Sequence, residues 1–286
     1  MASERTTPDP YFVLGNPIAH SKSPQIHARF AELTGQAIDY QRRLTPLDGF
    51  AATLAQLIRD GACGCNVTVP FKFQAFEAAA RQSARAQLAQ AANTLVFEKG
   101  AVYADNTDGL GLVNDIQNNA GVSLAGRDVL LIGAGGAAAG ALAPLVAAGP
   151  RRLVVVNRTQ AKAEALVARH RAHAFLRQAL QKTELLAQDL SALEGDFDVI
   201  VNASASSLSG GPPPVDHRHL KPGALAYDMM YGPAAEGFMA WARAHGASPR
   251  DGLGMLVEQA AEAFALWRGV RPPAAQVLRE LRAQPA

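Results

Sequence analysis

The chain has 286 residues, 49% of them hydrophobic, and a mean hydropathy of +0.00. This length favours about two domains, and this composition excludes an intrinsically disordered chain. With 27 Lys and Arg against 25 Asp and Glu, the formal net charge is +2. So weak a charge argues against nucleic acid or an anionic membrane as a partner and favours a small molecule.

The opening ten residues are polar and lack the apolar core of a secretory signal, so we expect a cytoplasmic protein. The longest apolar stretch, residues 137–148, is interrupted by a glycine and a proline. It is shorter than the roughly 20 residues that a membrane-spanning helix needs, so no transmembrane helix is expected.

Two cysteines, Cys63 and Cys65, flank Gly64 in a predicted strand. Small buried side chains in a reducing compartment are the simpler interpretation, and an exposed redox pair is the alternative. Their spacing does not indicate a zinc site, and we expect no metal. The sequence has no heptad seam, so monomer and homodimer both stay open.

Strand-like apolar runs alternate with helical stretches from the start of the chain. This alternation predicts βαβ units around a largely parallel sheet. The predicted elements of this first half are strands at 11–14, 39–44 and 64–69, helices from residues 24 and 47, and strands at 93–97 and 101–105. The last two strands flank Lys99-Gly100, a turn-like pair, and should form a hairpin.

A helix predicted from Asp108 to about Ala120 leads into a second βαβ series, with residues 108–111 as a candidate hinge. The later predicted elements are strands at 128–132, 153–156, 198–202 and 224–229, and helices from 160, across 234–245, across 255–267 and from 273. The glycine and proline run at 210–214 predicts a loop. Residues 169–188 show no clear period and stay unassigned, and periodicity does not assign the last two helices to a domain.

A glycine-rich loop follows the predicted strand at 128–132 and opens a helix. This is the context that a dinucleotide-binding fingerprint requires. Gly133 permits the tight turn, Gly135 lets the backbone approach a pyrophosphate, and Ala138 supplies the small third position. The helix N-terminus adds N–H groups for the anion.

The end of the next strand distinguishes the two nicotinamide cofactors. An NAD enzyme would have an acidic residue there for the ribose 2′-hydroxyl, whereas this chain has Arg158. A guanidinium suits a 2′-phosphate, and Lys162 in the first helical turn gains from an anion nearby. The sequence therefore predicts NADP, with two solvated surface charges as the alternative interpretation.

Two loops of the first half carry hydroxyls and a cation. Ser23 followed by Pro24 predicts a helix N-cap, which puts Ser21 and Ser23 on a strand-to-helix loop suited to a carboxylate or polyol. Lys72 is predicted in the first turn of another helix, where a cation is unfavourable unless an anion offsets it. Asp108, at a third helix start, is a candidate partner for that ammonium group.

Together these motifs closely resemble the shikimate dehydrogenase family. The resemblance spans nearly the whole chain and rests on residues 15–24, 66–72, 93–94, 105–109, 133–137, 157–159, 227–231 and 251–259. It implies a reversible, NADP-dependent reduction of 3-dehydroshikimate to shikimate, in the pathway to chorismate and the aromatic amino acids.

The resemblance also implies an α/β fold with two domains. We expect a substrate-binding, catalytic domain formed by residues 1–108 and 253–286, with the C-terminal helices returning to it. We expect residues 109–252 to form a Rossmann-type, doubly wound NADP domain.

Site residues follow from the matching positions. Lys72 and Asp108 are implied as the catalytic pair, with Lys72 the natural proton donor. Implied substrate contacts are Ser21, Ser23, Thr68, Lys72, Asn93, Asp108, Tyr231 and Gln259. Implied cofactor contacts are Gly133, Ala134, Gly135, Gly136, Ala137, Asn157, Arg158, Thr159, Lys162, Ser204, Met229 and Gly252. Ser204 replaces the family's usual threonine and keeps the hydroxyl.

Several alternatives remain open from the sequence. His20 is a rival catalytic group, although a packed or solvated histidine is the simpler interpretation. Other enzymes that would fit are a quinate-type ring-polyol dehydrogenase and a folate dehydrogenase. A protein that senses NADP without turnover is the alternative from another class.

Overall fold

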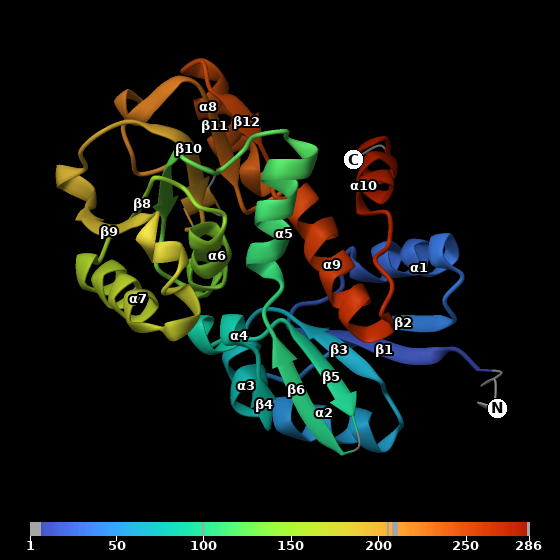
Figure 1. Ribbon diagram of the computed structural model, residues 1–286. Coiled ribbons are helices and arrows are strands. Elements are labelled where there is room, and N and C mark those ends of the chain that lie inside the picture. The colour runs from blue at the N-terminus through green and yellow to red at the C-terminus, as the bar shows by residue number, and fades with distance from the viewer. Residues whose placement is uncertain (1–6, 99, 205, 208–210, 285–286) are drawn as a thin grey trace. The chain divides into compact units, whose positions relative to one another are not determined.

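The computed structural model describes residues 7–98, 100–204, 206–207 and 211–284. The chain divides into two compact units, the first formed by Met1–Thr107 with Val257–Ala286 and the second by Asp108–Leu256. Each unit has its own six-stranded sheet with helices around it, which confirms the α/β class (Figure 1). In the described ranges, no helix has the length and hydrophobicity needed to cross a membrane.

The first unit is built from short strands and helices that follow one another along the chain. They are β1 (Asp9–Gly15), α1 (Ser23–Thr34), β2 (Ile38–Leu44), α2 (Phe50–Arg59), β3 (Gly64–Val67), α3 (Lys72–Glu77), β4 (Arg81–Gln82), α4 (Ala84–Ala89), β5 (Thr94–Glu98), β6 (Ala101–Asp105) and, near the end of the chain, α10 (Ala274–Arg282). The strand order is β2-β1-β3-β5-β6-β4. The pairs β1 with β2 and β1 with β3 are parallel, whereas β5 runs antiparallel to both β3 and β6.

The structure differs from the expected first half at three points. The helix predicted from residue 47 begins at Phe50, because a turn precedes it in which Gly49 N–H bonds to the carbonyl of Pro46 at 2.9 Å. The strand predicted at 64–69 ends at Val67, because the chain turns there and Phe71 N–H bonds to the carbonyl of Thr68 at 3.0 Å. The short elements β4 and α4 were not predicted, since a two-residue strand and a six-residue helix carry too little periodicity. The hairpin β5–β6 is confirmed, although Lys99 of its turn lies outside the described residues.

Helix α9 (Leu253–Arg268) continues from the second unit into the first. Within the first unit its Trp267 stacks on Tyr11 with ring centroids 4.6 Å apart and donates from Nε1 to the carbonyl of Leu95 at 3.0 Å. A Cβ at Gly64 would lie 2.7 Å from that indole nitrogen, so only glycine lets the helix approach β3 this closely. The return of the C-terminal helices to the first unit is thereby confirmed.

The second unit contains a wholly parallel sheet. Its elements are α5 (Asp108–Asn114), the π-helical turn η1 (Asp115–Asn119), β7 (Asp128–Ile132), α6 (Gly136–Ala147), β8 (Arg152–Asn157), α7 (Gln160–Ala172), β9 (Glu184–Asp189), β10 (Phe197–Asn202), β11 (Leu220–Asp228), α8 (Glu236–Ala244) and β12 (Ser248–Arg250). Short 3₁₀ turns lie at η2 (Ala174–Leu176), η3 (Ala179–Gln181), η4 (Leu190–Ala192), η6 (His217–His219) and η7 (Gly232–Ala235).

The strand order of this sheet is β12-β11-β10-β7-β8-β9. Numbered within the unit, this is the doubly wound order 3-2-1-4-5-6 read from the other edge, with the reversal between β7 and β10. Figure 1 shows α7 beside β9 and α8 beside β11 and β12. The carboxyl ends of β7, β8, β10 and β11 therefore share one edge, the edge at which such sheets bind ligands.

The unassigned residues 169–188 have three different structures. Helix α7 extends to Ala172, two 3₁₀ turns follow, and edge strand β9 begins at Glu184. Each piece is short, so no single period runs through the segment. Of the predicted loop at 210–214, Gly210 lies outside the described residues, and 211–213 belong to no helix or strand.

The helix predicted from Asp108 to Ala120 changes its winding part-way, at Asp115. Gly109 lies so close to α6 that a Cβ there would meet the carbonyl oxygen of Gly140 at 2.3 Å. Close helix packing thus explains this glycine physically.

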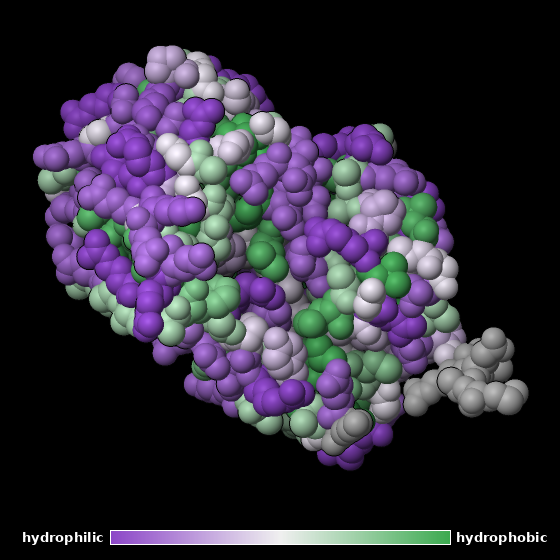
Figure 2. Space-filling view, in the orientation of Figure 1, coloured by the Kyte–Doolittle hydropathy of each residue, from purple (hydrophilic) through white to green (hydrophobic). Residues whose placement is uncertain are grey.

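On the face drawn in Figure 2, hydrophilic residues dominate and the apolar areas are interrupted by polar ones.

Candidate active site

The loops after β1 and β3 meet at the carboxyl edge of the first sheet. Gly15, the last residue of β1, lies against Thr68, and a Cβ at Gly15 would come within 2.6 Å of the Thr68 methyl group. Thr68 N–H also donates to the carbonyl of Leu14 at 2.9 Å. A glycine at position 15 therefore allows the Thr68 hydroxyl-bearing side chain to lie beside the loop that carries the two serines.

The serine loop differs from the expected cap. Lys22 is the N-cap of α1 and makes no capping side-chain bond, whereas Ser23 is the first residue of the helix. The prediction that Ser23 caps the helix is therefore wrong by one position. Ser21 performs the local bonding, since its hydroxyl donates to Ser23 Oγ at 3.2 Å and accepts from Ser23 N–H at 3.3 Å.

Arg42 on β2 anchors the backbone of this loop. Its Nε and Nη2 donate to the carbonyl oxygen of Ser21 at 3.0 and 2.6 Å. The sequence analysis missed Arg42, because nothing in an exposed edge strand marks one arginine as a loop anchor. His20, the rival catalytic residue, is exposed in the same loop.

A buried polar network surrounds Asn93. Its Nδ2 donates to Thr107 Oγ1 and to Gln259 Oε1, both at 3.0 Å, and its Oδ1 accepts from Thr107 N–H at 2.8 Å. Asn93 is 2% exposed and Gln259 8% exposed. The structure thus brings together two of the predicted substrate residues, although they are 166 positions apart in the sequence.

A further set of hydrogen bonds fixes the backbone at Asn93. Tyr40 OH donates to Asn66 Oδ1 at 2.7 Å, and Asn66 Nδ2 donates to the carbonyl of Asn93 at 3.0 Å and to Thr94 Oγ1 at 3.1 Å. All four residues are buried. The sequence did not predict a role for Tyr40 in the site, since a tyrosine on a strand is usually interpreted as a core residue.

The two predicted catalytic residues belong to different units. Lys72 is half-buried at the first position of α3, which has no acidic residue in its first turn, as expected. Its carbonyl accepts from Ala92 N–H at 2.9 Å, which ties the start of α3 to the segment that leads into Asn93. Asp108 is 7% exposed and begins α5, directly after Thr107 in the chain.

The glycine-rich loop of the second unit has the geometry that an anion site requires. Gly133 has φ +116°, and a Cβ there would lie 3.0 Å from the carbonyl oxygen of Ala203. Gly135 is the N-cap of α6, with no capping side chain, and a Cβ on it would meet no described atom within 4 Å. Ala138 is fully buried. The open helix start can therefore accept a phosphate group.

At the end of β8 the chain forms a turn, in which Asn157 Nδ2 donates to the carbonyl of Thr159 at 2.9 Å. Arg158 and Lys162 are both exposed. The first turn of α7 carries no acidic residue, so it remains favourable for an added anion. These residues fit a phosphate at the edge of the same sheet that carries Gly133.

A buried network that was not predicted joins the ends of β10 and β11. Asn202 Oδ1 accepts from Ser204 Oγ at 2.7 Å, and Asn202 Nδ2 donates to Ser207 Oγ at 2.8 Å and to Asp228 Oδ2 at 3.3 Å. Ser207 also donates to Asp228. Burial raises the pKa of the Asp228 carboxyl above its ordinary value, and these hydrogen bonds oppose that rise. The network fixes the loop that contains Ser204.

Met229 and Gly252 lie together just beyond this network. Met229 N–H bonds to the carbonyl of Asn202 at 3.0 Å, and Gly252 N–H bonds to the carbonyl of Met230 at 2.8 Å. A Cβ at Gly252 would lie 2.3 Å from the Met229 carbonyl oxygen, so the contact requires glycine. Tyr231 follows, half-buried, and burial raises the pKa of its hydroxyl.

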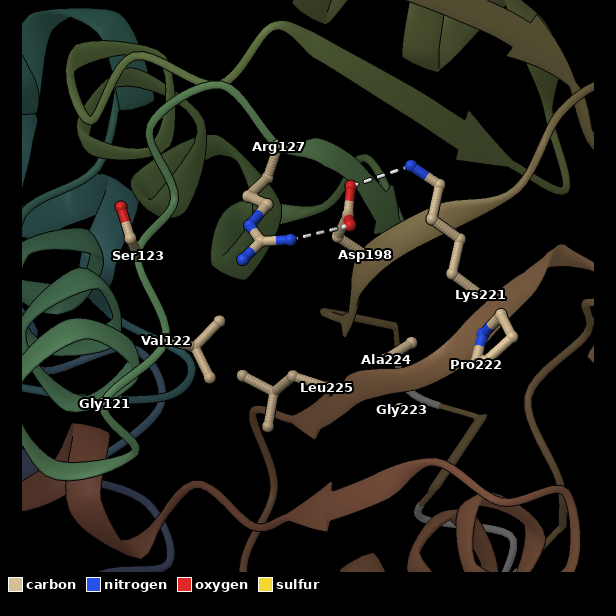
Figure 3. Close-up of a pocket in the computed structure, with 10 residues that line it drawn as sticks. All are labelled: Gly121, Val122, Ser123, Arg127, Asp198, Lys221, Pro222, Gly223, Ala224 and Leu225. Atoms are coloured by element: carbon tan, nitrogen blue, oxygen red, sulfur yellow. Dashed lines mark hydrogen bonds and ion pairs between the residues drawn. The ribbon is translucent and has the colours of Figure 1, made fainter.

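A pocket of about 310 Å³ opens at the opposite, amino-terminal edge of this sheet (Figure 3). Asp198 lies between two cations in it, Arg127 Nη1 at 3.1 Å and Lys221 Nζ at 2.9 Å. Each cation of the pocket is thus already paired with its carboxylate, and the cluster joins the starts of β10 and β11 to the residue before β7. None of the predicted site residues lines this pocket.

The chain is similar in sequence and structure to known proteins. Three family models match: the shikimate dehydrogenase substrate binding domain over residues 13–95, the shikimate/quinate 5-dehydrogenase domain over 115–209, and the shikimate 5′-dehydrogenase C-terminal domain over 252–282. The chain belongs to the shikimate dehydrogenase family. The family resemblance seen in the sequence is confirmed.

Individual members of the shikimate dehydrogenase family are similar along almost the full chain. A protein of Acidovorax sp. (strain JS42) named shikimate dehydrogenase (NADP(+)) is 67% identical over 275 residues, covering 96% of both chains. One of Paracidovorax citrulli with the same name is 64% identical, covering 98% of both. The crystal structure of shikimate 5-dehydrogenase from Thermus thermophilus with NADP(H) and shikimate is 31% identical, covers 96% of this chain and 98% of its own, and superposes with a TM-score of 0.82.

The family models cover most, but not all, of the predicted site. The serine loop, Lys72 and Asn93 fall in the first matched range, the glycine-rich loop and Arg158 in the second, and Gln259 in the third. Asp108, Met229 and Tyr231 lie between the matched ranges. For these three, local geometry carries the argument.

Proposed function

We propose that this protein catalyses the reversible, NADP-dependent reduction of 3-dehydroshikimate to shikimate. The observation that carries the proposal is the 67% identity, over 96% of the chain, to a relative named for this activity and this cofactor. The substrate residues are the two serines, Thr68, Lys72, Asn93, Asp108, Tyr231 and Gln259. We also propose a cytoplasmic location, which the free thiols of Cys63 and Cys65 support, because disulfides are rare there.

In this proposal the first unit binds the substrate and the second binds the cofactor. The buried amide groups of Asn93 and Gln259 fit a ring that carries several hydroxyls, since each amide offers both a donor and an acceptor. Ser21, Ser23 and Thr68, at the neighbouring strand ends, supply further hydroxyl groups. A buried polar site of this kind rejects analogues that leave its groups unpaired.

The reaction requires a hydride at the carbonyl carbon and a proton at the carbonyl oxygen. NADPH supplies the hydride when it is bound. Lys72 donates the proton from its ammonium group, which also stabilises negative charge on the oxygen as the bond order falls. Asp108 is the proposed second member of the catalytic pair and accepts a hydrogen bond from an adjacent substrate hydroxyl. In the direction of oxidation, neutral Lys72 takes the proton back.

The cofactor residues fit NADP in two respects. The open start of α6, after the left-handed Gly133, accepts the pyrophosphate, with Ala134, Gly135, Gly136 and Ala137 as the lining backbone. Arg158 and Lys162 provide two exposed cations for a 2′-phosphate, with Asn157 and Thr159 shaping the turn. Ser204, Met229 and Gly252 complete the proposed cofactor contacts at the ends of the neighbouring strands.

An assay of the purified protein tests the proposed function. Shikimate and quinate are each offered with NADP and NAD, and the rise in NADPH or NADH absorbance is followed. We expect turnover with shikimate and NADP to exceed that of every other combination. Greater turnover with quinate would support a ring-polyol dehydrogenase, and NADP binding without turnover of either compound would support a sensor.

A pair of variants tests the role of Lys72. Lys72→Met should lower kcat by roughly 10²–10⁴, the usual contribution of a general acid or base, with NADPH affinity unchanged. Lys72→Arg keeps the positive charge but cannot release a proton near neutral pH, so it should stay nearly as slow. Lys182→Met, at an exposed position of the other unit, is the control. Normal turnover in Lys72→Arg would exclude proton transfer by this residue.

A further inference from the structure

A fully buried carboxylate in the second unit plays no part in the proposed chemistry. Asp115 is 0% exposed, and both its oxygens are engaged. Arg250 binds it with two hydrogen bonds, Nε to Oδ2 and Nη2 to Oδ1, each 2.6 Å, and Tyr227 OH donates to Oδ2 at 2.8 Å. Asn119 Nδ2 donates to Oδ1 at 3.0 Å. A buried ion pair often adds little net stability, so a structural role in fixing local geometry has to be argued from its contacts.

The chain changes its winding at this residue. The α-helical bonding of α5 ends at Asn114, and η1 begins at Asp115, with Ala120 N–H bonding to the Asp115 carbonyl at 2.9 Å. Such π-helical turns are rare and occur frequently at functional sites. Here the turn accompanies the inward position of the Asp115 carboxylate.

Two hydrogen-bond partners of Asp115 come from neighbouring strands. Tyr227 on β11 and Arg250 on β12 are paired residues in the parallel ladder. Two positions further along the chain, just beyond the end of each strand, lie Met229 and Gly252, the residues in backbone contact at the carboxyl edge. A single carboxylate thus bonds to both strands two positions before the proposed cofactor contacts.

The start of α9 is fixed by the same group. A Cβ at Gly254 would lie 1.9 Å from Asp115 Oδ1, so the backbone of the first turn of α9 rests directly on the carboxylate. This contact accounts for a glycine of the segment 251–254 that the proposed function leaves unexplained. Asp115 therefore contacts η1, β11, β12 and the beginning of α9 at once.

We propose that Asp115, acting through Arg250 and Tyr227, is the positioning residue for the part of the cofactor site formed by Met229 and Gly252. This inference rests on the proposed function. Hydrogen bonding to Asp115 raises the pKa of Arg250, so the guanidinium remains charged. Because the strand ends that Asp115 joins lead directly to Met229 and Gly252, we expect its loss to weaken cofactor handling more than substrate recognition, which it reaches only through α9 and the segment that leads to Tyr231.

The test compares steady-state kinetics of Asp115→Asn with those of the wild type. Asparagine keeps the shape but removes the charge and one acceptor, so the ends of β11 and β12 lose their fixed spacing. We expect kcat/KM for NADPH to fall by up to roughly 10²-fold, which a misplacement of about 1 Å can cost, with a much smaller change in KM for 3-dehydroshikimate. Tyr227→Phe removes only the 2.8 Å bond and should show the same pattern more weakly.

Asp128→Asn is the matched control. Asp128 is also a buried carboxylate of the second unit, 2% exposed and bonded to Lys221 Nζ at 2.9 Å, but it lies at the amino-terminal edge of the sheet. We expect it to lower stability while kcat/KM for NADPH stays near the wild-type value. If Asp115→Asn fails to fold, Tyr227→Phe carries the test alone.

Three results would overturn the inference. The first is an unchanged kcat/KM for NADPH in folded Asp115→Asn or, if that variant does not fold, in Tyr227→Phe. The second is an equal loss of kcat/KM for NADPH in Asp128→Asn. The third is a change in Asp115→Asn that is confined to KM for 3-dehydroshikimate. An inactive wild type would instead contradict the proposed function, so the two failures are distinguishable. Equilibrium binding of NADPH, followed by its fluorescence, provides a second readout that does not depend on turnover.

Discussion

The buried histidine of the first unit makes the pH dependence of stability predictable. His27 is 0% exposed and stacks on Tyr40 at 4.2 Å, with Phe264 at 6.1 Å and Trp267 at 5.4 Å from its ring. Among the described residues, neither ring nitrogen has a hydrogen-bond partner. Burial therefore lowers the pKa of His27 from 6.5 to about 3, and the nearby Asn66 carboxamide offsets this only in part.

The sign and size of the effect follow from proton linkage. Between these two pKa values the unfolded chain binds a proton at His27 that the folded chain does not, so stability falls as the pH drops below about 6.5. At 1.36 kcal/mol per pH unit, the loss reaches about 2 kcal/mol at a pH of about 5 and is negligible at about 7.5. It would continue to grow down to the folded-state pKa of about 3.

The assay is urea unfolding at those two pH values, with and without His27→Phe. Phenylalanine removes the titrating group and keeps an aromatic ring in the stack. In a Trp241→Phe background, Trp267 is the remaining tryptophan of the chain and reports on the first unit. His170 in the second unit, whose pKa burial lowers to about 4, acts in the same direction and is common to both proteins.

We expect the free energy of unfolding to drop by about 2 kcal/mol less in His27→Phe than in its parent between the two pH values. The absolute stability of the variant at neutral pH does not enter this comparison. The same pH dependence in both proteins would refute the reasoning, because it would mean that His27 is protonated as readily in the folded chain as in the unfolded one.

Two further predictions concern the proposed sites. Arg158→Ala should raise KM for NADP(H) roughly tenfold and leave KM for NAD(H) unchanged. This factor is at the lower end of the range for a hydrogen bond to a charged group, because Arg158 is exposed. Equal losses in kinetic assays with both cofactors would contradict the prediction. Gly15→Val should raise KM for shikimate and spare KM for NADP(H), because a Cβ there would come within 2.6 Å of Thr68; an unchanged KM for shikimate would remove this contact from the argument.

Local sequence signals predicted much of the fold correctly. The strand at 128–132, the glycine-rich turn and the helix after it were predicted because each leaves a mark within a few residues: apolar run, glycine pair, small side chains. The hairpin at β5 and β6 was recognised from its turn. These elements obey local rules and need no information from distant parts of the chain.

The errors and omissions concern residues whose local structure depends on contacts with residues far away in the sequence. Ser23 was expected to cap α1, but the loop is fixed by Arg42, twenty-one residues from the Ser21 carbonyl that it binds. The change of winding at Asp115 coincides with its contact to Arg250, 135 positions away, and helical periodicity does not predict it. Strand β9 forms because β8 offers an edge to pair with, not because its own sequence alternates.

The candidate site shows the same division. Sequence motifs identified Asn93 and Gln259 through the family resemblance, and the structure shows the hydrogen bond that joins them. Tyr40, which supports this pair through Asn66, carries no sequence signal, since its role depends on a phenolic oxygen reaching a carboxamide on another strand. Polar residues that hold other polar residues are found only when their partners are known.

The most direct measurement follows the hydride itself. NADPH carrying deuterium at the transferable position is mixed with 3-dehydroshikimate and the purified protein, and the product is analysed by NMR. We expect shikimate with deuterium on the ring carbon that bears the new hydroxyl group, formed by the wild type and hardly at all by Lys72→Met. Unlabelled product, or unconsumed NADPH in the presence of folded wild-type protein, would contradict it.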